Sequence, residues 1–532
     1  MSGFTVPPSD AGVLRAMPCA SPCAPRAAPW ILATTILASS MVFIDGTAVN
    51  IALPALQVEL NASLVDVQWV IEAYALFLAA LILVGGAAGD RLGRRRVFLL
   101  GVALFAISSI GCGFAGSARE LIVARAFQGV GGALLVPGSL AIISASFAEQ
   151  DRGRAIGTWS GATAITAALG PVLGGWLIDH VSWRAVFFIN LPLAIVVVAI
   201  AIRHVPESRN MEMKGTLDWP GALLVTLGLG GVVYGLIESP NAGWSHPRIV
   251  ASLLLGFLAL AGFIAVEMHR PEPMLPPHLF RSKTFVGANV LTLLLYMALG
   301  GSLFFVPLNL IQVQGYSTTA AGAALLPLIL LLAVLSRWSG CLIVRYGATA
   351  PLVVGPTIAA CGFALFAAPG VGGSYWTTFF PATVVLGLGM AVSVAPLTTT
   401  VMNSVDVSFS GAASGINNAA SRVAALLAVA VFGLIMASIF NRTLHGNVER
   451  AALSPAMIEA VERQQSKLAA IELPAGTAVD GAALARRAVA NAFVTAFRWV
   501  MLISATLALA SAVCAWLLIA SATQRVGATG LP

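Results

Sequence analysis

The stretch Gly85-Gly86-Ala87-Ala88-Gly89-Asp90-Arg91-Leu92-Gly93-Arg94-Arg95-Arg96 ends a long apolar segment with one acid, four arginines and recurring glycines. An apolar helix that ends in several arginines is typical of a chain leaving a membrane on its positive, cytoplasmic side. The glycines allow two backbones to approach closely, and Asp90 offers a carboxylate to a helix end or an arginine. A loop that only sets topology explains the last three arginines but leaves the glycine and Asp90 pattern unexplained.

The composition of the whole chain also indicates a membrane protein. Of its 532 residues, 58% are hydrophobic and only 10% are charged, whereas soluble domains carry about 25% charged residues. The net charge of +7 is spread over short loops between apolar runs, which is not the pattern of a nucleic-acid-binding surface. We therefore expect membrane lipids around the chain and no nucleic-acid partner.

Apolar runs long enough to cross a bilayer, which takes about 20 residues, recur along the chain. They lie near 31–56, 66–89, 97–116, 120–147, 155–178, 184–203, 217–238, 248–267, 284–311, 319–344, 350–370, 376–402, 410–440 and 493–521. These fourteen runs predict an all-α membrane protein whose two ends lie on the same side, because the number of spans is even.

The basic residues between the runs predict which side that is. Alternate loops are rich in arginine and lysine, namely Arg91, Arg94, Arg95, Arg96, Arg152, Arg154, Arg203, Arg209, Lys214, Arg270, Arg281, Lys283 and Arg345. The loops between them hold Arg119, Arg184 and Arg248 one at a time. This bias places the basic loops and both termini in the cytoplasm, with the chain in the cytoplasmic (inner) membrane.

The two tails and one long loop fall outside this pattern of spans. Residues 1–29 and 526–532 are expected to be cytoplasmic tails; Cys19 and Cys23 in the first give a C-x3-C spacing that is weak evidence for a metal and fits a disordered tail. Residues 441–492 carry mixed charge and are expected outside, with an amphipathic helix near 455–471. A solvated cap is one interpretation of this loop, and a docking element for a partner such as a periplasmic adaptor protein is the other.

A weak internal repeat divides the chain into two halves. The run Gly340-Cys341-Leu342-Ile343-Val344-Arg345-Tyr346-Gly347 repeats the glycine, arginine and glycine of residues 86–93, with Val344 in the place of Asp90. A duplicated six-helix unit with two inserted helices accounts for this, and duplication is usual in transporters. We expect six-helix bundles at 30–205 and 271–525 and two additional helices at 206–270.

Four stretches of the chain resemble motifs of the major facilitator superfamily. Residues 86–95 resemble its G-x-x-x-D-R-x-G-R-R signature, and 44–54 (IDGTAVNIALP) the first-helix motif of its fourteen-helix drug–proton antiporters. Residues 125–133 (RAFQGVGGA) match the R-x-x-Q-G-x-G-x-A pattern, and 169–176 (LGPVLGGW) contain the G-P-x-x-G-G motif associated with antiporters. The resemblance implies two six-helix bundles plus two extra helices, and export of lipophilic or cationic compounds in exchange for protons.

The sequence gives little support to an enzyme. It contains no G-x-x-x-x-G-K-[ST] run for a nucleotide and no H-E-x-x-H cluster. We therefore predict no cofactor and no metal site. Besides the multidrug antiporter, two functions stay open: a dedicated exporter of one metabolite or antibiotic, and a membrane sensor that has lost transport.

Two acids lie inside the predicted spans. A charged group at the centre of a membrane helix costs at least about 2.5–3.5 kcal/mol. Asp45 lies halfway along the first span. One interpretation is an acid that is hydrogen-bonded to a nearby hydroxyl or to Asn50. The other is a protonatable or cation-sensing carboxylate. Glu72 lies about one turn inside the second span, either as a solvated acid at the mouth or as part of the site.

Two arginines and two asparagines complete the predicted site. The resemblance links Arg125 to proton coupling, because a fixed positive charge promotes proton release from a nearby acid; the alternative is an arginine that only binds backbone carbonyls. Arg422 lies deep in its span beside Asn417 and Asn418. It is predicted to line the cavity or to pair with Asp45 or Glu72.

A second group of residues is predicted to serve the conformational switch. In the basic loop these are Gly86, Asp90, Arg91, Gly93 and Arg94, with Asp90 expected to latch one conformation electrostatically. In the fifth span they are Gly170, Pro171, Gly174 and Gly175. Small residues permit close helix contact and a proline bends a helix, which suits rocking between halves; ordinary tight packing is the alternative.

Overall fold

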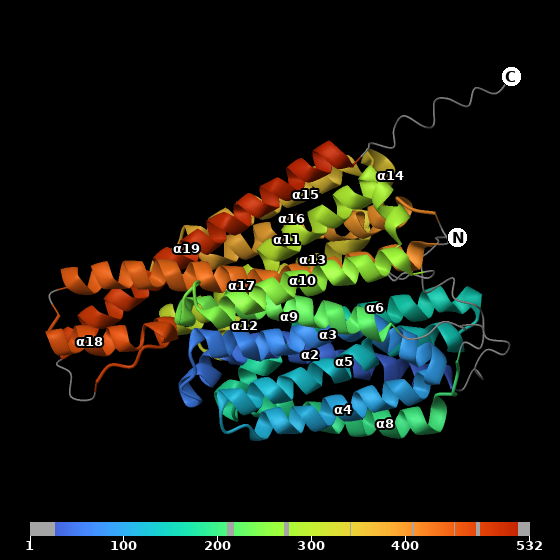
Figure 1. Cartoon of the computed structure of the whole chain (residues 1–532), viewed down its shortest axis with the longest axis horizontal. Helices are drawn as coiled ribbons and strands as arrows, with labels where there is room; N and C mark the ends of the chain where they lie inside the picture. The colour runs from blue at the N-terminus through green and yellow to red at the C-terminus, as the bar shows by residue number, and fades with distance from the viewer. Residues whose placement is uncertain are drawn as a thin grey trace.

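The computed structural model describes residues 27–209, 218–270, 276–340, 342–406, 409–451, 453–474 and 479–519. Within these ranges the regular elements are all helices, and fourteen of the helices are long and apolar enough to cross a membrane. Figure 1 shows them running side by side along the long axis of the molecule. The predicted all-α membrane fold is therefore confirmed. The predicted tails lie outside the described residues, apart from 27–29.

The first bundle holds six spans. They are α2 (Ala28–Glu59), α3 (Leu64–Leu92), α4 (Arg94–Phe114), α5 (Ala118–Ser146), α6 (Glu149–His180), and the consecutive pieces α7 (Ala185–Phe188) and α8 (Asn190–His204). Two of these helices begin at capping residues that directly follow short loops. Ser63 forms a capping box with Asp66 at the start of α3, and Ser117 caps α5. Polar residues between the apolar runs thus determine where α3 and α5 begin.

The second bundle holds the other six spans of the fold. They are α11 (Lys283–Leu308) with the π-helical turn η3 (Asn309–Val313), α12 (Thr318–Ala324) with α13 (Leu326–Gly340), α15 (Thr349–Ala367), α16 (Phe379–Asn403), α17 (Ser410–Arg450) and α19 (Val479–Leu518). The short helices η2 (Pro277–Arg281) and α14 (Leu342–Tyr346) connect them. The repeat seen in the sequence recurs in the backbone, since Gly93 and Gly347 both adopt positive φ, +114° and +75°, at the turn after a helix.

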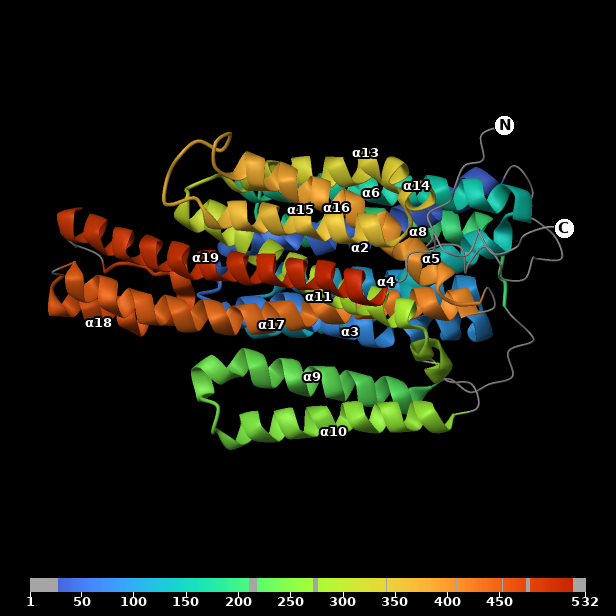
Figure 2. The same ribbon diagram turned by 90° about the horizontal axis from the view of Figure 1, so that it is seen from above.

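The two additional helices form a hairpin of their own. They are α9 (Trp219–Ala242) and α10 (Pro247–His269), and Figure 2 shows the pair set to one side, with α9 next to α3 and α17. Asp218 closes the open end of the hairpin: its carboxylate caps α9 at Gly221 and binds Arg270 Nη2 at 2.9 Å. The pair is therefore held against one face of the two bundles.

Helices α17 and α19 continue far beyond the length that a membrane requires. They contain 41 and 40 residues, and such helices are about 60 Å long, twice the hydrocarbon thickness. The predicted loop 441–492 is therefore partly helical, because its polar residues end the membrane span without ending the helix. Between the two extensions lie α18 (Pro455–Arg463) and η5 (Gln465–Ala470), where an amphipathic helix was predicted.

The two ends of the molecule can be distinguished by their contacts. Helix α2 begins beside His204, whose ring stacks on Trp30 at 5.1 Å, and ends where Gln57 Nε2 donates to Lys467 O. We call these the Asp90 end, which holds the basic loop 90–96, and the α18 end, which holds residues 451–474. The basic loop and the α18 segment thus lie at opposite ends, as the charge pattern predicts.

The bundles are joined toward the α18 end. Hydrogen bonds between the two bundles at that end include those from Gln68 Nε2 to Val429 O at 2.7 Å and from Gln312 Nε2 to Gln57 Oε1 at 2.9 Å. Toward the Asp90 end, a Cβ atom added at Gly161 of α6 or Gly340 of α13 would meet nothing within 4 Å. Figure 1 shows α15 and α19 diverging from α4 and α8 in that direction.

Candidate functional site

A buried ion pair lies at the centre of the first bundle. Arg125 Nη1 on α5 donates to Asp45 Oδ2 on α2 at 2.5 Å, and Asp45 and Arg125 are 0% and 1% exposed. Arg125 Nε also donates to the carbonyl oxygen of Val70 on α3 at 3.0 Å. One guanidinium therefore ties three helices together.

Gln128 completes the ion pair and extends it into a network. Lying one turn after Arg125, it accepts from Arg125 Nη1 at 2.7 Å and donates to Asp45 Oδ1 at 2.9 Å. Its amide also contacts Ser109 Oγ on α4 at 3.3 Å, and Asn190 of α8 donates to the same oxygen at 3.0 Å. Both Asp45 oxygens are thus occupied, and α2, α3, α4, α5 and α8 meet at this network.

Aromatic rings enclose the guanidinium. Its carbon atom lies 4.2 Å from the ring centre of Tyr74 and 5.9 Å from that of Phe187. Such contacts stabilise a desolvated cation by up to about 2 kcal/mol. Breaking a buried ion pair by removing one partner costs about 3–5 kcal/mol, because the remaining charge stays uncompensated. The ion pair needs an ionised Asp45, so a proton on Asp45 competes with Arg125 for the same carboxylate.

The structure shows which partners these two residues have in this arrangement. Asn50 donates to Gly46 O at 3.2 Å, so Asn50 is not the partner of Asp45. Arg125 binds a backbone carbonyl, as its structural interpretation required, and also the acid, as the coupling interpretation required. Gln128 was not predicted, although it stands in the quoted R-x-x-Q motif three residues after Arg125.

Glu72 is buried away from this network. It is 1% exposed, so its interpretation as a solvated acid at the mouth is wrong. Val70 and Tyr74 point toward α5, because Arg125 binds Val70 O and a Cβ at Gly129 would lie 2.4 Å from Tyr74 O. Glu72, midway between them in a helix, therefore lies on the other face of α3.

The predicted residues of α17 lie apart from the ion pair. Arg422 is half-buried, and the contacts of the described residues join it to neither Asp45 nor Glu72. Asn417 donates to Thr292 Oγ1 on α11 at 2.6 Å and lies within 3.3 Å of Asn289 Oδ1, while Asn418 is exposed. Asp45 is paired with Arg125 in this arrangement and not with Arg422, and the alternative that Arg422 lines the cavity stays a prediction.

The basic loop is held within the first bundle. Asp90 Oδ1 accepts from Arg94 Nε at 2.8 Å, one turn further along the chain. Glu207 accepts from Arg95 N at 3.1 Å, and its carboxylate would lie 2.6 Å from a Cβ at Gly93. Arg91 lies half-buried on the last turn of α3, and a Cβ at Gly86 would lie 3.5 Å from Pro137, in ordinary contact. Asp90 thus binds Arg94 of its own loop, and none of its contacts with the described residues reaches the other bundle.

Gly170, Gly174 and Gly175 lie where α6 packs closely against other helices. A Cβ at Gly170 would lie 2.0 Å from Thr47 Oγ1, and one at Gly174 would lie 2.7 Å from Ala48 Cβ, so both face α2. A Cβ at Gly175 would lie 2.5 Å from Thr318 O, across the boundary between the bundles. Pro171 lies in the same contact, since a Cβ at Gly322 of α12 would lie 2.2 Å from Pro171 O.

An unpredicted acid completes this contact. Asp179, near the end of α6, accepts from Thr319 N at 2.8 Å, Thr319 Oγ1 at 2.5 Å and Thr318 N at 3.2 Å, and it also binds Thr318 Oγ1. It thereby caps α12 from the opposite bundle. We call the contact of Gly175, Asp179, Thr318, Thr319 and Gly322 the α6–α12 gate.

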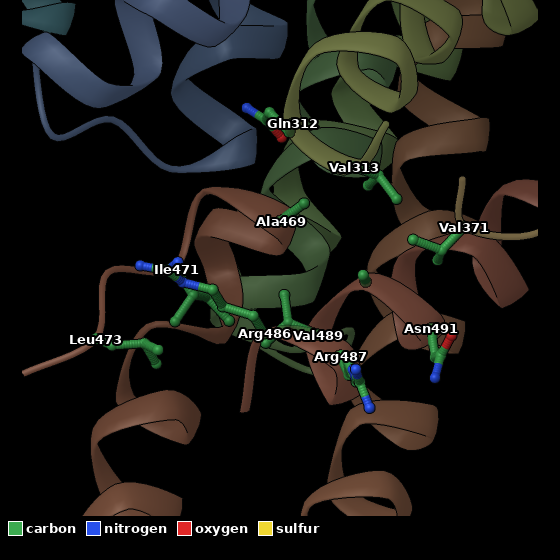
Figure 3. A pocket seen from close by; sticks show the side chains of 11 residues that line it. Gln312, Val313, Val371, Ala469, Ile471, Leu473, Arg486, Arg487, Val489 and Asn491 are labelled. Carbon is green, nitrogen blue, oxygen red and sulfur yellow. The ribbon is translucent and has the colours of Figure 1, made fainter. Parts of the chain in front are cut away.

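A separate pocket lies at the α18 end. It has a volume of about 610 Å³, and none of the residues lining it is a predicted site residue. Figure 3 shows residues that line it, contributed by η3, η5, the start of α19 and the segments that follow α15 and η5: Gln312, Val313, Val371, Ala469, Ile471, Leu473, Arg486, Arg487, Val489 and Asn491. This pocket is not the buried polar network.

Two six-helix bundles that contact at one end, with an ion pair buried inside one of them, define a membrane transporter. The chain belongs to the Major Facilitator Superfamily, whose family model matches residues 35–429. It is a multi-pass membrane protein.

Curated relatives carry names of resistance and export. The chain is 37% identical to the tetracenomycin C resistance and export protein of Streptomyces glaucescens, over 78% of this chain and 77% of the relative. It is 33% identical to the multidrug resistance protein Stp of Mycobacterium tuberculosis strain H37Rv, over 80% and 79%. It is 35% identical to the puromycin resistance protein pur8 of Streptomyces alboniger, over 76% and 81%.

Solved structures share the fold. A bacterial homolog to the human lysosomal transporter Spinster, inward-facing and unoccupied, superposes with a TM-score of 0.64 at 18% identity, covering 93% of this chain and 98% of that one. The inward-open xylose transporter XylE from E. coli gives a TM-score of 0.56 at 13% identity, covering 93% and 97%. At these identities the comparison concerns the fold alone.

Proposed function

We propose that this protein is a proton-coupled antiporter that exports lipophilic or cationic drugs and toxic compounds across the cytoplasmic membrane. The observation that supports it most is the buried pair of Asp45 and Arg125, a titratable acid bound to a fixed cation inside a transporter bundle. The names of the relatives support export of antibiotics and other drugs. Fourteen spans with both ends in the cytoplasm, and division at 30–205, 206–270 and 271–525, belong to the same proposal.

The present arrangement is the inward-facing one in this proposal. The α18 end is the outer end, where the α6–α12 gate is closed, and the Asp90 end opens to the cytoplasm. Asp45 has both oxygens bonded and is fully buried, so a substrate cannot touch it in this arrangement. We therefore assign Asp45 to proton exchange and not to direct recognition of a cation.

The proton and Arg125 use the same carboxylate in the cycle. When a proton occupies Asp45, the guanidinium loses its ionic partner but keeps the carbonyl of Val70 and the amide oxygen of Gln128. The contacts of α2 with α5 then change, and α2 also carries the contacts of Gly170 and Gly174 with α6. Proton binding at Asp45 is thus linked mechanically to the helix that forms the α6–α12 gate.

Two other candidate functions, a dedicated exporter and a sensor, differ from this proposal in what they would do with a bound compound. A dedicated exporter of a single metabolite or antibiotic would use the same ion pair with a narrower substrate, as the names of several relatives suggest. A sensor would bind compounds without moving them. A periplasmic adaptor protein would dock at the α18 end, where the extensions of α17 and α19 project.

The test is gradient-driven efflux from membrane vesicles by the Asp45→Asn variant. The amide keeps the size of the side chain but loses its charge, so it isolates the electrostatic contribution. We expect the variant to lose uphill export of both ethidium, a cation, and chloramphenicol, a neutral compound, while downhill exchange persists. Persistence of downhill exchange also shows that the variant is folded.

The matched control is Glu120→Gln, which neutralises an exposed acid at the start of α5 in the same bundle. It should retain uphill export of both compounds. Loss of ethidium export alone in Asp45→Asn would instead assign Asp45 to cation recognition. Full export of both compounds would remove Asp45 from the mechanism, and no transport by the wild-type protein would favour the sensor.

A further inference from the structure

The contact between α3 and α17 is a seam between the two bundles. On α3, Gln68 donates to Val429 O of α17 at 2.7 Å, and a Cβ at Gly433 would meet the Gln68 side chain. Two turns further along α3, Leu76 packs beside Gly230 of α9. We call the face of α3 formed by Gln68, Glu72 and Leu76, with the residues of α17 and α9 opposite, the α3–α17 seam.

Glu72 occupies the middle of this seam. It lies one turn after Gln68 and one turn before Leu76, so the three side chains share one face of α3. The hydrophobic cluster around it contains Leu76 of α3, Val233 of α9 and Leu426 of α17, all less than 9% exposed. Helices of both bundles and of the additional pair therefore surround this position.

The Glu72 carboxyl is buried, and no hydrogen bond or ion pair joins it to another of the described residues. It is 1% exposed, and its buried Oε2 atom makes no hydrogen bond among the described residues. An isolated ionised carboxylate in such surroundings costs so much free energy that the neutral, protonated form is favoured instead. Exposure to water reverses this preference, because water solvates the ionised form.

The charged groups nearest to the seam are engaged elsewhere. On α9, Glu238 accepts from Trp69 Nε1 at 3.0 Å, and on α5 Arg125 binds Asp45 and faces the opposite side of α3. On η5, Lys467 Nζ binds Gln464. Arg422 of α17 lies one turn before Leu426 and near enough to Tyr74 to interact with it electrostatically, and the ion pairs of the described residues do not join it to Glu72. No cation among the described residues is thus paired with Glu72.

We propose that Glu72 is a second proton-binding site of the transport cycle, located in the α3–α17 seam, and that its protonation holds the bundles closed at the α18 end. A proton from the water outside adds to the carboxylate while the seam is open, and the neutral acid is then buried when the seam closes. The proton returns to the same side when the seam reopens. This inference rests on the proposed function only in requiring that the seam opens during the cycle.

The position of Glu72 also suggests a role for the additional helices α9 and α10. Helix α9 covers the side of the seam through the hydrogen bond from Trp69 to Glu238 and the contact of Leu76 with Gly230. Without α9, this side of Glu72 would face lipid or water. The hairpin thus keeps the closed seam dry, so that proton binding at Glu72 and closure remain linked.

The experiment measures the distance across the α18 end as the pH changes. Spin labels are attached to Val58→Cys in the first bundle and Trp376→Cys in the second, both exposed positions, after the six native cysteines are replaced by serine. In wild-type protein in lipid nanodiscs, we expect acidification to increase the short-distance, closed population. In Glu72→Gln, which is permanently neutral, we expect the closed population at every pH and loss of the pH response.

The matched control is Glu238→Gln, which neutralises the acid of α9 on the same seam and keeps a hydrogen-bond acceptor for Trp69. It should keep the wild-type pH response. An unchanged response in Glu72→Gln, or its loss in Glu238→Gln alone, would overturn the proposal for Glu72 while leaving the proposed transport cycle intact. A single distance at every pH in the wild-type protein would overturn both.

Discussion

Arg125 binds an acid, an amide and a backbone carbonyl at once, and this multiplicity makes it hard to replace. In Arg125→Met the carboxylate of Asp45 stays buried without a cation, so we expect the free energy of unfolding to fall by about 3–5 kcal/mol. The double variant Asp45→Asn/Arg125→Met removes both charges and should recover a large part of this loss. Thermal unfolding of the purified protein in detergent measures both changes.

A double-mutant cycle supplies the control for this expectation. If the two single losses simply add in the double variant, the residues are not coupled and the ion pair is not what stabilises the junction of α2 and α5. Glu120→Gln again serves as a neutral reference, because its carboxylate is exposed.

At the residue scale, the sequence could single out charges but not their partners. Asp45 and Arg125 stand out because a charge inside an apolar run is costly wherever it points. Which charges meet depends on how the helices pack, so Arg422 looked as suitable a partner for Asp45 as Arg125. Asp179 gave no signal at all, because an acid at the end of a span is expected to be solvated.

At the scale of single elements, α6 offers a comparison within one helix. A Cβ at Gly175 would lie 2.5 Å from Thr318 O, whereas one at Gly161 would meet nothing within 4 Å. We expect Gly175→Ala to prevent the close approach of α6 and α12, to shift the protein toward the arrangement open at the α18 end, and to abolish uphill export. Overpacking of this kind typically costs about 1–3 kcal/mol.

The matched control for Gly175→Ala is Gly161→Ala, which adds the same methyl group to the same helix in open space. It should leave ethidium export and the distance between labels at Val58→Cys and Trp376→Cys unchanged. Equal loss of export in both variants would mean that helix flexibility, not the α6–α12 gate, explains these glycines.

Helix ends were less predictable than helix identity. Hydropathy places the apolar part of each span well, because lipid demands a fixed length of apolar sequence. It cannot show where a helix ends in water, so the spans near 410–440 and 493–521 became the much longer α17 and α19. The amphipathic segment at α18 was visible because its apolar residues recur at helical spacing.

At the scale of the whole molecule, the orientation in the membrane can be tested with two cysteines. Ser454→Cys at the start of α18 should react with an impermeant thiol reagent in intact cells. Leu92→Cys, beside the basic loop and 60% exposed, should react only after the membrane is permeabilised. The positive-inside bias is the physical reason, and a protein without native cysteines is the background.

Labelling of Leu92→Cys from outside intact cells would reject the orientation, and labelling of both cysteines from outside would also reject the number of spans between them. The fold itself was predictable because bilayer thickness and charge bias act on every span in the same way. The closure at the α18 end was not, since hydropathy and charge bias do not specify which ends of the two bundles touch.

The length of α17 has a mechanical consequence. The helix runs without a break from Ser410 to Arg450, and a rigid rod of about 60 Å moves its tip by about 1 Å for each degree of rotation at its base. A small rotation of the second bundle would therefore produce a larger displacement at the Arg450 end of α17. A fluorescent dye near Arg450 would report each turnover of a single molecule as a change in its distance from the membrane surface.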